Sequence, residues 1–183
     1  MKTVLRILCV IPFILFSLTV LNSQSLKNLE DNNGFKKYKL GSRFVLSTGV
    51  KMKNEEGGDK VVIDYTTETI SDIPVKTIEL IYLRDTLSKI VVRVLPEFYS
   101  SLLEACINSF GQPTEDNRTG TGNYSTERYI WKGKRFNLEY YYNYPSVSGG
   151  GYGKKDLFLS YTLNDFIQRM QRTKTGNYSA KDF

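Results

Sequence analysis

Residues 75–111 read VKTIELIYLRDTLSKIVVRVLPEFYSSLLEACINSFG, and this stretch decides the fold class. It opens with two runs rich in β-branched and aromatic residues, Val75–Leu83 and Lys89–Leu95, which the polar segment Arg84–Ser88 separates. Such runs are typical of two strands joined as a hairpin. Both are apolar on nearly both faces, so we expect them to lie in the centre of a sheet.

A helix follows at Pro96, because proline is favoured in the first turn of a helix. Apolar side chains then recur at helical spacing and form a single stripe. They are Tyr99, Leu102, Leu103, Cys106, Ile107 and Phe110. Gly111 and Pro113 supply the stop signal. The pattern predicts an amphipathic helix over 96–110, and it places Cys106 on the apolar stripe as a buried, inert thiol.

Shorter strand patterns lie on both sides of this stretch. Those before it cover residues 35–40, 44–50 and 60–67, and those after it cover 128–131, 135–144 and 157–161. A polar loop over 112–125 and a glycine-rich loop over 148–153 separate the later ones, and a short helix is expected over 166–172. Strands joined by short turns around one long helix predict an α+β fold. We therefore expect a mostly antiparallel sheet, with the amphipathic helix 96–110 packed on it and a short C-terminal helix.

The start of the chain has the pattern of a cleaved signal peptide over residues 1–23. Lys2 and Arg6 precede an apolar run, Ile7–Leu21, and polar residues follow it. This run of about 15 residues is shorter than the ~20 that a spanning helix needs, so no transmembrane span is expected after signal removal. Leu21 fits the small-residue rule for cleavage poorly, which leaves the cleaved bond open. The pattern predicts export to a periplasm or to the extracellular space.

The predicted organisation after the signal is a single domain. A polar lead-in over 24–34 precedes the α+β domain at 35–172, and a flexible tail is expected over 173–183. Of the two cysteines, Cys9 leaves with the signal peptide, so we expect no disulfide within the domain.

Composition narrows the possible chemistry. The 183 residues include no histidine, which excludes Ser-His-Asp and Cys-His catalysis and imidazole metal sites. We therefore expect no catalytic residues, no metal and no cofactor. The formal net charge is +6, with 25 Lys and Arg against 19 Asp and Glu. This mild basic bias favours anionic surfaces, but an exported protein is not expected to meet nucleic acid.

The best candidate binding surface is the aromatic hairpin over 128–144, because in a half-buried strand alternate side chains point to opposite faces. Exposed aromatic rings beside lysines would offer flat stacking surfaces and charge, as carbohydrate and anionic-ligand sites do. The candidate ligand-binding residues are Tyr129, Trp131, Lys132, Lys134 and Tyr141, with Tyr152 from the glycine-rich loop. The alternative for these aromatic residues is that they fill the core under the helix.

Several stretches of the chain resemble a loose group of small exported bacterial α+β proteins of unknown function. They are GFKKYKLG at 34–41, LSKIVV at 87–92, FGQP at 110–113, Trp131, and LSY at 159–161. The resemblance spans most of the chain after the signal peptide. It implies export and an α+β fold, and it implies no activity.

The sequence favours an exported, non-enzymatic binding or accessory module of the cell envelope or the extracellular space. Its expected partners are an envelope glycan, an anionic glycolipid or another envelope protein. A hydrolase that uses paired carboxylates or Ser/Lys chemistry is one alternative. A small outer-membrane β-barrel is another, suggested by the tyrosine-rich strands and the terminal Phe183, although the helix over 96–110 argues against it.

Overall fold

The computed structural model describes most of the chain after the predicted signal peptide. The described residues are 28–43, 50–53, 58–64, 66–121, 124–145 and 154–175. The predicted signal peptide at 1–23, Tyr152 and most of the predicted tail lie outside them, so export remains a prediction. Among the helices of the described part, none is long and apolar enough to cross a membrane.

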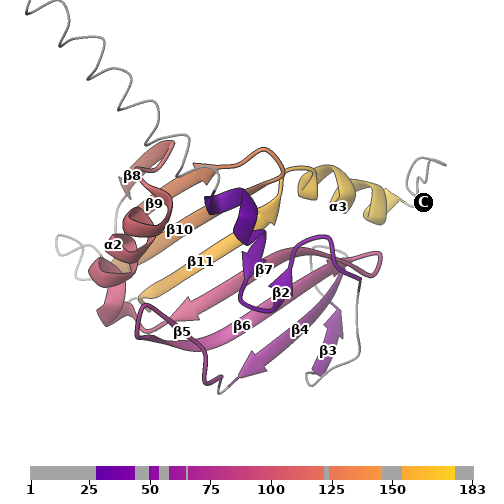
Figure 1. Ribbon diagram of the computed structural model, residues 1–183, viewed down its shortest axis with the longest axis horizontal. Coiled ribbons are helices and arrows are strands. Elements are labelled where there is room, and N and C mark those ends of the chain that lie inside the picture. Colours follow the sequence, from indigo (N-terminus) through magenta and orange to yellow (C-terminus); the bar gives the residue numbers. More distant parts are fainter. Residues whose placement is uncertain are drawn as a thin grey trace, which may run out of the picture.

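One antiparallel sheet of nine strands dominates the fold (Figure 1). The strands are β3 (Val50–Lys53), β4 (Asp59–Asp64), β5 (Thr69–Ile70), β6 (Ile73–Leu83), β7 (Thr86–Val94), β8 (Glu115–Thr121), β9 (Tyr124–Lys132), β10 (Phe136–Pro145) and β11 (Asp156–Leu163). Their order is β3-β4-β6-β7-β11-β10-β9-β8, with β5 paired to β6. A separate hairpin joins β1 (Gly34–Phe35) to β2 (Tyr38–Lys39). The predicted α+β class with a mostly antiparallel sheet is confirmed at this level.

The predicted central hairpin is β6 and β7, which lie between β4 and β11. The expected polar loop Arg84–Ser88 was too long, because strand pairing resumes at Thr86. Only Arg84 and Asp85 form the turn, with φ of +50° and +58°. Two central residues with positive φ are the mark of a tight hairpin turn whose twist matches that of the strands. Since this turn contains no glycine, its sequence does not reveal how short it is.

The helical segment begins at Pro96 as predicted. A 3-10 turn over Pro96–Phe98 leads into α2 (Tyr99–Phe110), which ends at Gly111. Gly111 has a φ of +75°, and its N–H donates to the Ile107 carbonyl at 2.8 Å. The segment is therefore a 3-residue turn and a 12-residue α-helix rather than one long helix.

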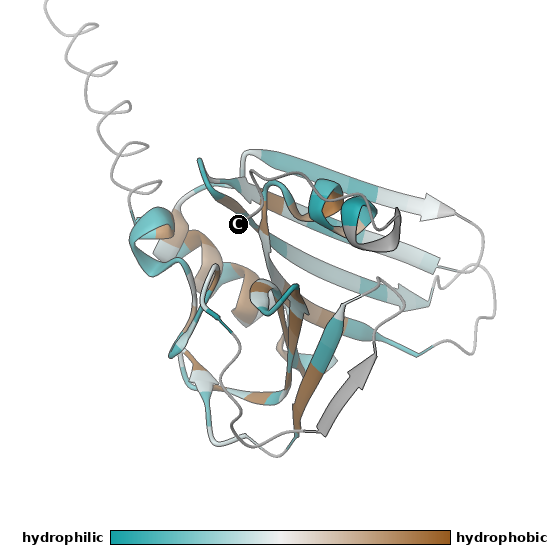
Figure 2. Cartoon of the chain, turned by 90° about the vertical axis from the view of Figure 1, so that its right-hand side faces the viewer, coloured by the Kyte–Doolittle hydropathy of each residue, from teal (hydrophilic) through white to brown (hydrophobic). Residues whose placement is uncertain are grey.

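The two faces of the sheet differ because side chains alternate along each strand. We call the face against α2 the front face and the other the back face. The front face carries the main hydrophobic core, to which α2 contributes Leu102 and Cys106. In Figure 2 apolar segments lie on α2 and on several strands of the sheet, and part of α3 is also apolar. Burial raises the pKa of the Cys106 thiol to about 12, and this free cysteine is buried as predicted.

Residues 28–34 of the expected polar lead-in belong to the folded part of the chain. Residues 28–32 form a helical turn, and Leu29 is buried in the main core. The Glu30 carboxylate accepts hydrogen bonds from the backbone N–H groups of Lys134 and Arg135, at the turn between β9 and β10. One apolar side chain and one carboxylate thus fix a segment that is otherwise polar in sequence.

The predicted polar loop over 112–125 is largely strand. It contains β8 and the start of β9, which pair through seven successive residues. The prediction failed because the β8 residues from Asp116 to Gly120 are exposed and none is apolar, so no apolar alternation marks this strand.

The expected C-terminal helix is present as α3 (Phe166–Thr175), three residues longer than predicted. Phe166 and Met170 pack on Ile81 and Leu83 in a second, smaller apolar cluster. These two β6 residues alternate with Leu80 and Tyr82 of the main core, so α3 covers one part of the back face.

Candidate functional site

Two of the predicted ligand-binding residues lie in the core. Trp131 is 1% exposed, and its indole Nε1 donates a hydrogen bond to the Gly111 carbonyl at 2.8 Å. Tyr129 is also buried, and its ring centroid is 5.6 Å from that of Tyr140. Both side chains point to the front face, where the main core needs large apolar groups. The prediction that they form an exposed stacking surface is therefore wrong.

The other described candidates are dispersed. Lys132 pairs with Glu115 on the back face, and Lys134 is exposed at the turn after β9. Tyr141 also lies on the back face, where its ring stacks on Phe158 at a centroid distance of 4.7 Å. Since alternate residues point to opposite faces, one hairpin cannot bring Trp131 and Tyr141 to the same ligand.

The structure instead gathers three other tyrosines at one end of the front face. The ring of Tyr142 lies between those of Tyr99 and Tyr144, at centroid distances of 5.0 and 4.8 Å. The interplanar angles are 15° and 25°, so the three rings are nearly parallel. We call Tyr99, Tyr142 and Tyr144 the tyrosine stack.

Two elements position this stack. Tyr142 and Tyr144 alternate along β10 on the front face, and Tyr99 is the first residue of α2. The hydroxyl of Tyr140, one step earlier on the same face, donates to the Tyr99 carbonyl at 2.9 Å. That bond fixes the start of α2 against β10 and brings the third ring onto the other two.

The stack is buried in the middle and open at its ends. Tyr142 is 6% exposed, whereas Tyr99 is 44% exposed and Tyr144 is partly exposed. Among the described residues, each outer ring stacks on Tyr142 alone. Burial, with the nearby Tyr99 and Tyr144, raises the pKa of the Tyr142 hydroxyl, so this ring is neutral at physiological pH.

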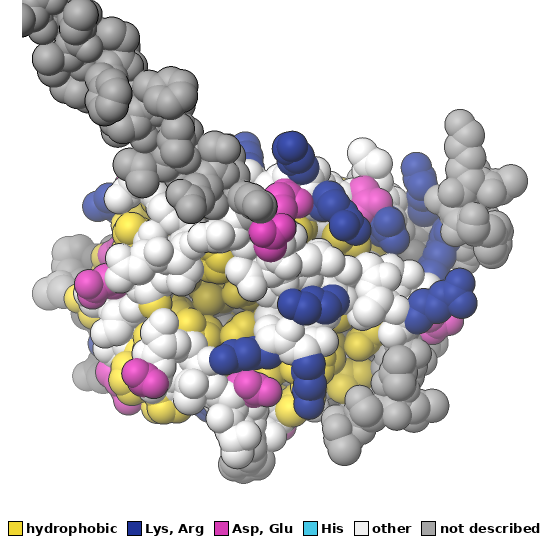
Figure 3. Space-filling view, viewed as in Figure 1, with side chains coloured by type: hydrophobic (Ala, Val, Ile, Leu, Met, Phe, Trp, Pro, Cys, Tyr) yellow, Lys and Arg dark blue, Asp and Glu magenta, His cyan; other side chains and the backbone are white. Residues whose placement is uncertain are grey.

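Further apolar surface lies at the same end of the sheet. Leu95 follows β7, and Tyr124 pairs with Pro145 beside Tyr144. Leu95 is 38% and Tyr124 is 42% exposed, and with Tyr99 they are three of the four large hydrophobic residues that the described part exposes. Hydrophobic side chains are visible at this left-hand end of the molecule in Figure 3.

Few polar groups of the described residues lie near the stack. In the β9–β10 register, Glu127 lies opposite Tyr142 and Ser125 lies opposite Tyr144. The Tyr129 hydroxyl donates to Glu127 Oε2 at 3.4 Å. Among the described residues, the site therefore combines flat aromatic rings with hydroxyl groups and the carboxylate of Glu127, which has Arg118 opposite it on β8.

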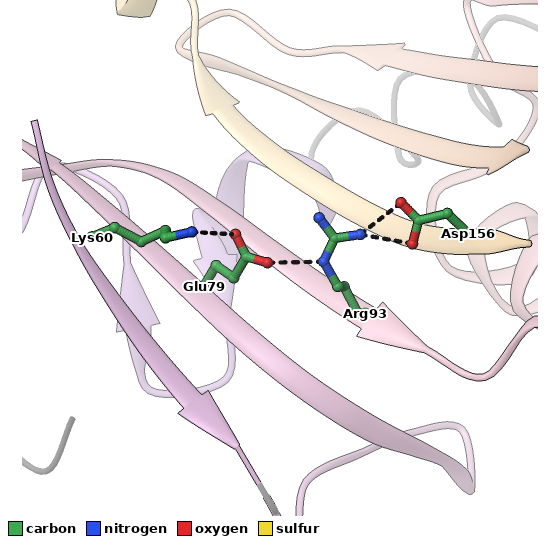
Figure 4. A network of polar contacts seen from close by, with 4 residues as sticks. All are labelled: Lys60, Glu79, Arg93 and Asp156. Carbon is green, nitrogen blue, oxygen red and sulfur yellow. Dashed lines mark hydrogen bonds and ion pairs between the residues drawn. The ribbon is translucent and has the colours of Figure 1, made fainter. Parts of the chain in front are cut away.

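The back face is organised differently, around a row of ion pairs (Figure 4). Arg93 donates to Glu79 at 2.8 Å and to both carboxylate oxygens of Asp156 at 2.7 Å. Lys60 lies 3.8 Å from the other Glu79 oxygen. Desolvation alone would lower the Arg93 pKa, but its bonds to Asp156 and Glu79 raise it. These charges are paired within the protein, so the row is a structural feature rather than a ligand site.

Sequence reasoning placed Tyr99 on the helix stripe, and the alternation expected along the strand at 135–144 puts Tyr142 and Tyr144 on one face. It missed their stacking, because the contact joins residues 99 and 142 across the fold and leaves no local signal. Comparison of the chain with protein-family models, with curated proteins and with solved structures finds no match.

Proposed function

We propose that the protein is an exported carbohydrate-binding module whose site is the tyrosine stack. The observation that carries this proposal is a row of three parallel rings with partly exposed outer members. Export rests on the signal-peptide pattern at residues 1–23. The proposal keeps the predicted ligand class and moves the site from Trp131 to Tyr99 and Tyr144.

Sugar rings suit this surface for two reasons. The C–H faces of a pyranose are apolar enough to pack on an aromatic ring, and the outer rings at Tyr99 and Tyr144 provide such surfaces. Sugar hydroxyl groups can exchange hydrogen bonds with tyrosine hydroxyls, with Ser125 and with the carboxylate of Glu127.

The charge at the site favours a neutral glycan over an anionic one. Glu127 is a carboxylate, and it lies opposite Tyr142 in the strand register. The lysines of the original prediction lie elsewhere, since Lys132 is on the back face and Lys134 is at the far end of β9 and β10. Arg118 lies opposite Glu127 in the β8–β9 register, so the two charges offset each other and an anionic glycolipid would gain little attraction at the stack.

The proposal is tested by titrating the purified protein with glycans and recording NMR chemical shifts. Chitohexaose, cellohexaose and maltohexaose serve as neutral probes, and polygalacturonate serves as the anionic probe. We expect a neutral probe to shift the signals of Tyr99 and Tyr144 and to leave that of Tyr141 unchanged.

The chain offers a matched set of variants for this titration. Tyr99→Ala and Tyr144→Ala each remove one outer ring and should weaken binding about tenfold. Tyr141→Ala removes a partly exposed ring from the back face and should leave the affinity unchanged. The proposal fails if no neutral probe shifts the stack, or if Tyr141→Ala weakens binding as much as Tyr99→Ala does.

A further inference from the structure

The strand β8 lies at one end of the sheet, where it pairs with β9 on one side only (Figure 1). Its residues from Asp116 to Gly120 are exposed. The outer edge of such a strand presents backbone N–H and C=O groups that another strand can pair with. Among the described strands, none pairs with this edge.

This edge is regular enough to serve as a template. The register of β8 with β9 runs without a shift from Glu115 to Thr121. The segment contains no proline, which would remove a backbone donor. Bulges and prolines are common ways in which proteins prevent strand addition at an edge, and β8 lacks both.

The charges on β8 are arranged symmetrically about Asn117. Asp116 and Arg118 point to the same face and form an ion pair at 2.7 Å. Arg118 lies 5.5 Å from the ring centroid of Tyr129, which places both charges on the front face. Their side chains remain 44% and 64% exposed, so both charges are accessible to a partner.

We propose that β8 is a self-association edge, at which two copies of the chain pair antiparallel about a twofold axis through Asn117. In this register Asp116 of one copy lies opposite Arg118 of the other, and the reciprocal pair forms by symmetry. Directly opposed charges of opposite sign stabilise an antiparallel strand pair, so the sequence of β8 complements itself.

Neighbouring registers are disfavoured by the same charges. An axis through Asp116 places two carboxylates opposite each other, and an axis through Arg118 places two guanidinium groups opposite each other. A register shifted by a single residue would place a front-face residue of one copy opposite a back-face residue of the other. The twofold axis does not allow this, because directly opposed residues of an antiparallel pair point to the same face. The charges therefore select one register and hinder pairing with strands of another pattern.

The expected dimer is weak. Pairing of one short strand covers less surface than a typical stable interface does, so the association should depend on concentration in the micromolar to millimolar range. The internal pair between Asp116 and Arg118 is exposed and contributes little, so exchanging it for the intermolecular pairs costs little.

Sedimentation velocity of the purified protein over a concentration series up to about 1 mM tests this inference. We expect a reversible monomer–dimer equilibrium. Arg118→Asp places two Asp–Asp pairs across the axis, and Asp116→Arg places two Arg–Arg pairs there. Each variant should weaken the dimer at least about tenfold.

Recombining the charges provides the control for folding. An equimolar mixture of the Arg118→Asp and Asp116→Arg proteins restores both opposite-charge pairs and should form a heterodimer. The double variant Asp116→Arg/Arg118→Asp should dimerise like the original protein. A monomer at every concentration overturns the proposal, as does a dimer that single reversals leave unchanged or a mixture in which no heterodimer forms.

Discussion

The two faces of the central sheet are stabilised in different ways. On the front face, apolar side chains are buried under α2 and the N-terminal segment, and they form one continuous core. On the back face beside β7 and β11, charged and aromatic side chains contact their neighbours across the strands. Apart from the small apolar cluster under α3, one sheet thus uses burial on one side and pairwise cross-strand contacts on the other.

This difference has a consequence for the effects of substitutions. The free energy gained by burying apolar side chains depends on close packing throughout the core. Removing one large front-face side chain therefore weakens the packing of many neighbours. Back-face contacts are local and partly hydrated, so removing one side chain should affect mainly the residue that it contacts directly. The two faces can be compared by substituting residues of similar size on each.

The largest effect is expected at Trp131. Trp131→Ala leaves a cavity under α2 and removes the bond to the Gly111 carbonyl, so the free energy of unfolding should fall by about 3–5 kcal/mol. Tyr141→Ala on the back face is the matched control and should cost about 1 kcal/mol. Urea unfolding followed by circular dichroism measures both. Equal losses would show that the two faces are not stabilised differently.

The second prediction concerns the buried thiol of Cys106. Its pKa is raised from 9.0 to about 12 in the folded state, so the neutral thiol favours folding. This contribution is complete below pH 9 and is lost as the pH rises towards 12, because the unfolded chain releases its proton first.

The test compares the original protein with Cys106→Ala, since the tyrosines titrate in both. Between pH 8 and about pH 10.5 the stability of the original protein relative to the variant should fall by an amount on the order of 1–2 kcal/mol. Urea unfolding at the two pH values provides the measurement. A difference that does not change with pH would mean that the thiol is hydrated in the folded state.

The front-face elements could be largely predicted from the sequence, because burial leaves a periodic pattern. The apolar runs of β6 and β7, the alternation in β10 and the stripe from Leu102 to Phe110 are each visible locally. The class of the fold followed from these elements. The burial of Leu29 could not be predicted locally, since a single apolar residue in a polar segment forms no periodic pattern.

The back face and the candidate site could not be predicted in the same way. The sequence of β8 is polar throughout, so an exposed edge strand is indistinguishable from a loop. The same alternation that identified the aromatic hairpin leaves open which set of rings is buried, and the requirement for core volume decided this for Trp131. The contact of Tyr99 with Tyr142 depends on how α2 docks, which no local pattern encodes.

A smaller effect is expected from the ion-pair row of the back face. Arg93→Met keeps an apolar stem over the Phe158 ring but removes the charge that binds Glu79 and Asp156. The loss of stability should be about 1 kcal/mol, because the side chains are partly hydrated. Lys60→Met removes the longer contact to Glu79 and should cost less than about 0.5 kcal/mol.

Salt provides the check on this assignment. Screening shortens the range of electrostatic interactions, so the Arg93→Met loss should shrink between about 50 mM and about 1 M NaCl. Urea unfolding at both salt concentrations measures the change. A loss independent of salt would assign the role of Arg93 to packing on Phe158.

The smallest effect is the coupling between the stacked rings of Tyr141 and Phe158. In a double-mutant cycle with Tyr141→Leu and Phe158→Leu, the interaction energy should be about 0.5 kcal/mol. On the back face each ring has few other partners, so this coupling should be a large share of either single loss.

For Trp131→Phe and Leu138→Ala on the front face, the single losses should far exceed any coupling, because each side chain also packs on the rest of the core. If the coupling energy is an equally small fraction of the single-variant losses of stability on both faces, the back face is stabilised by many shared contacts, as the front face is.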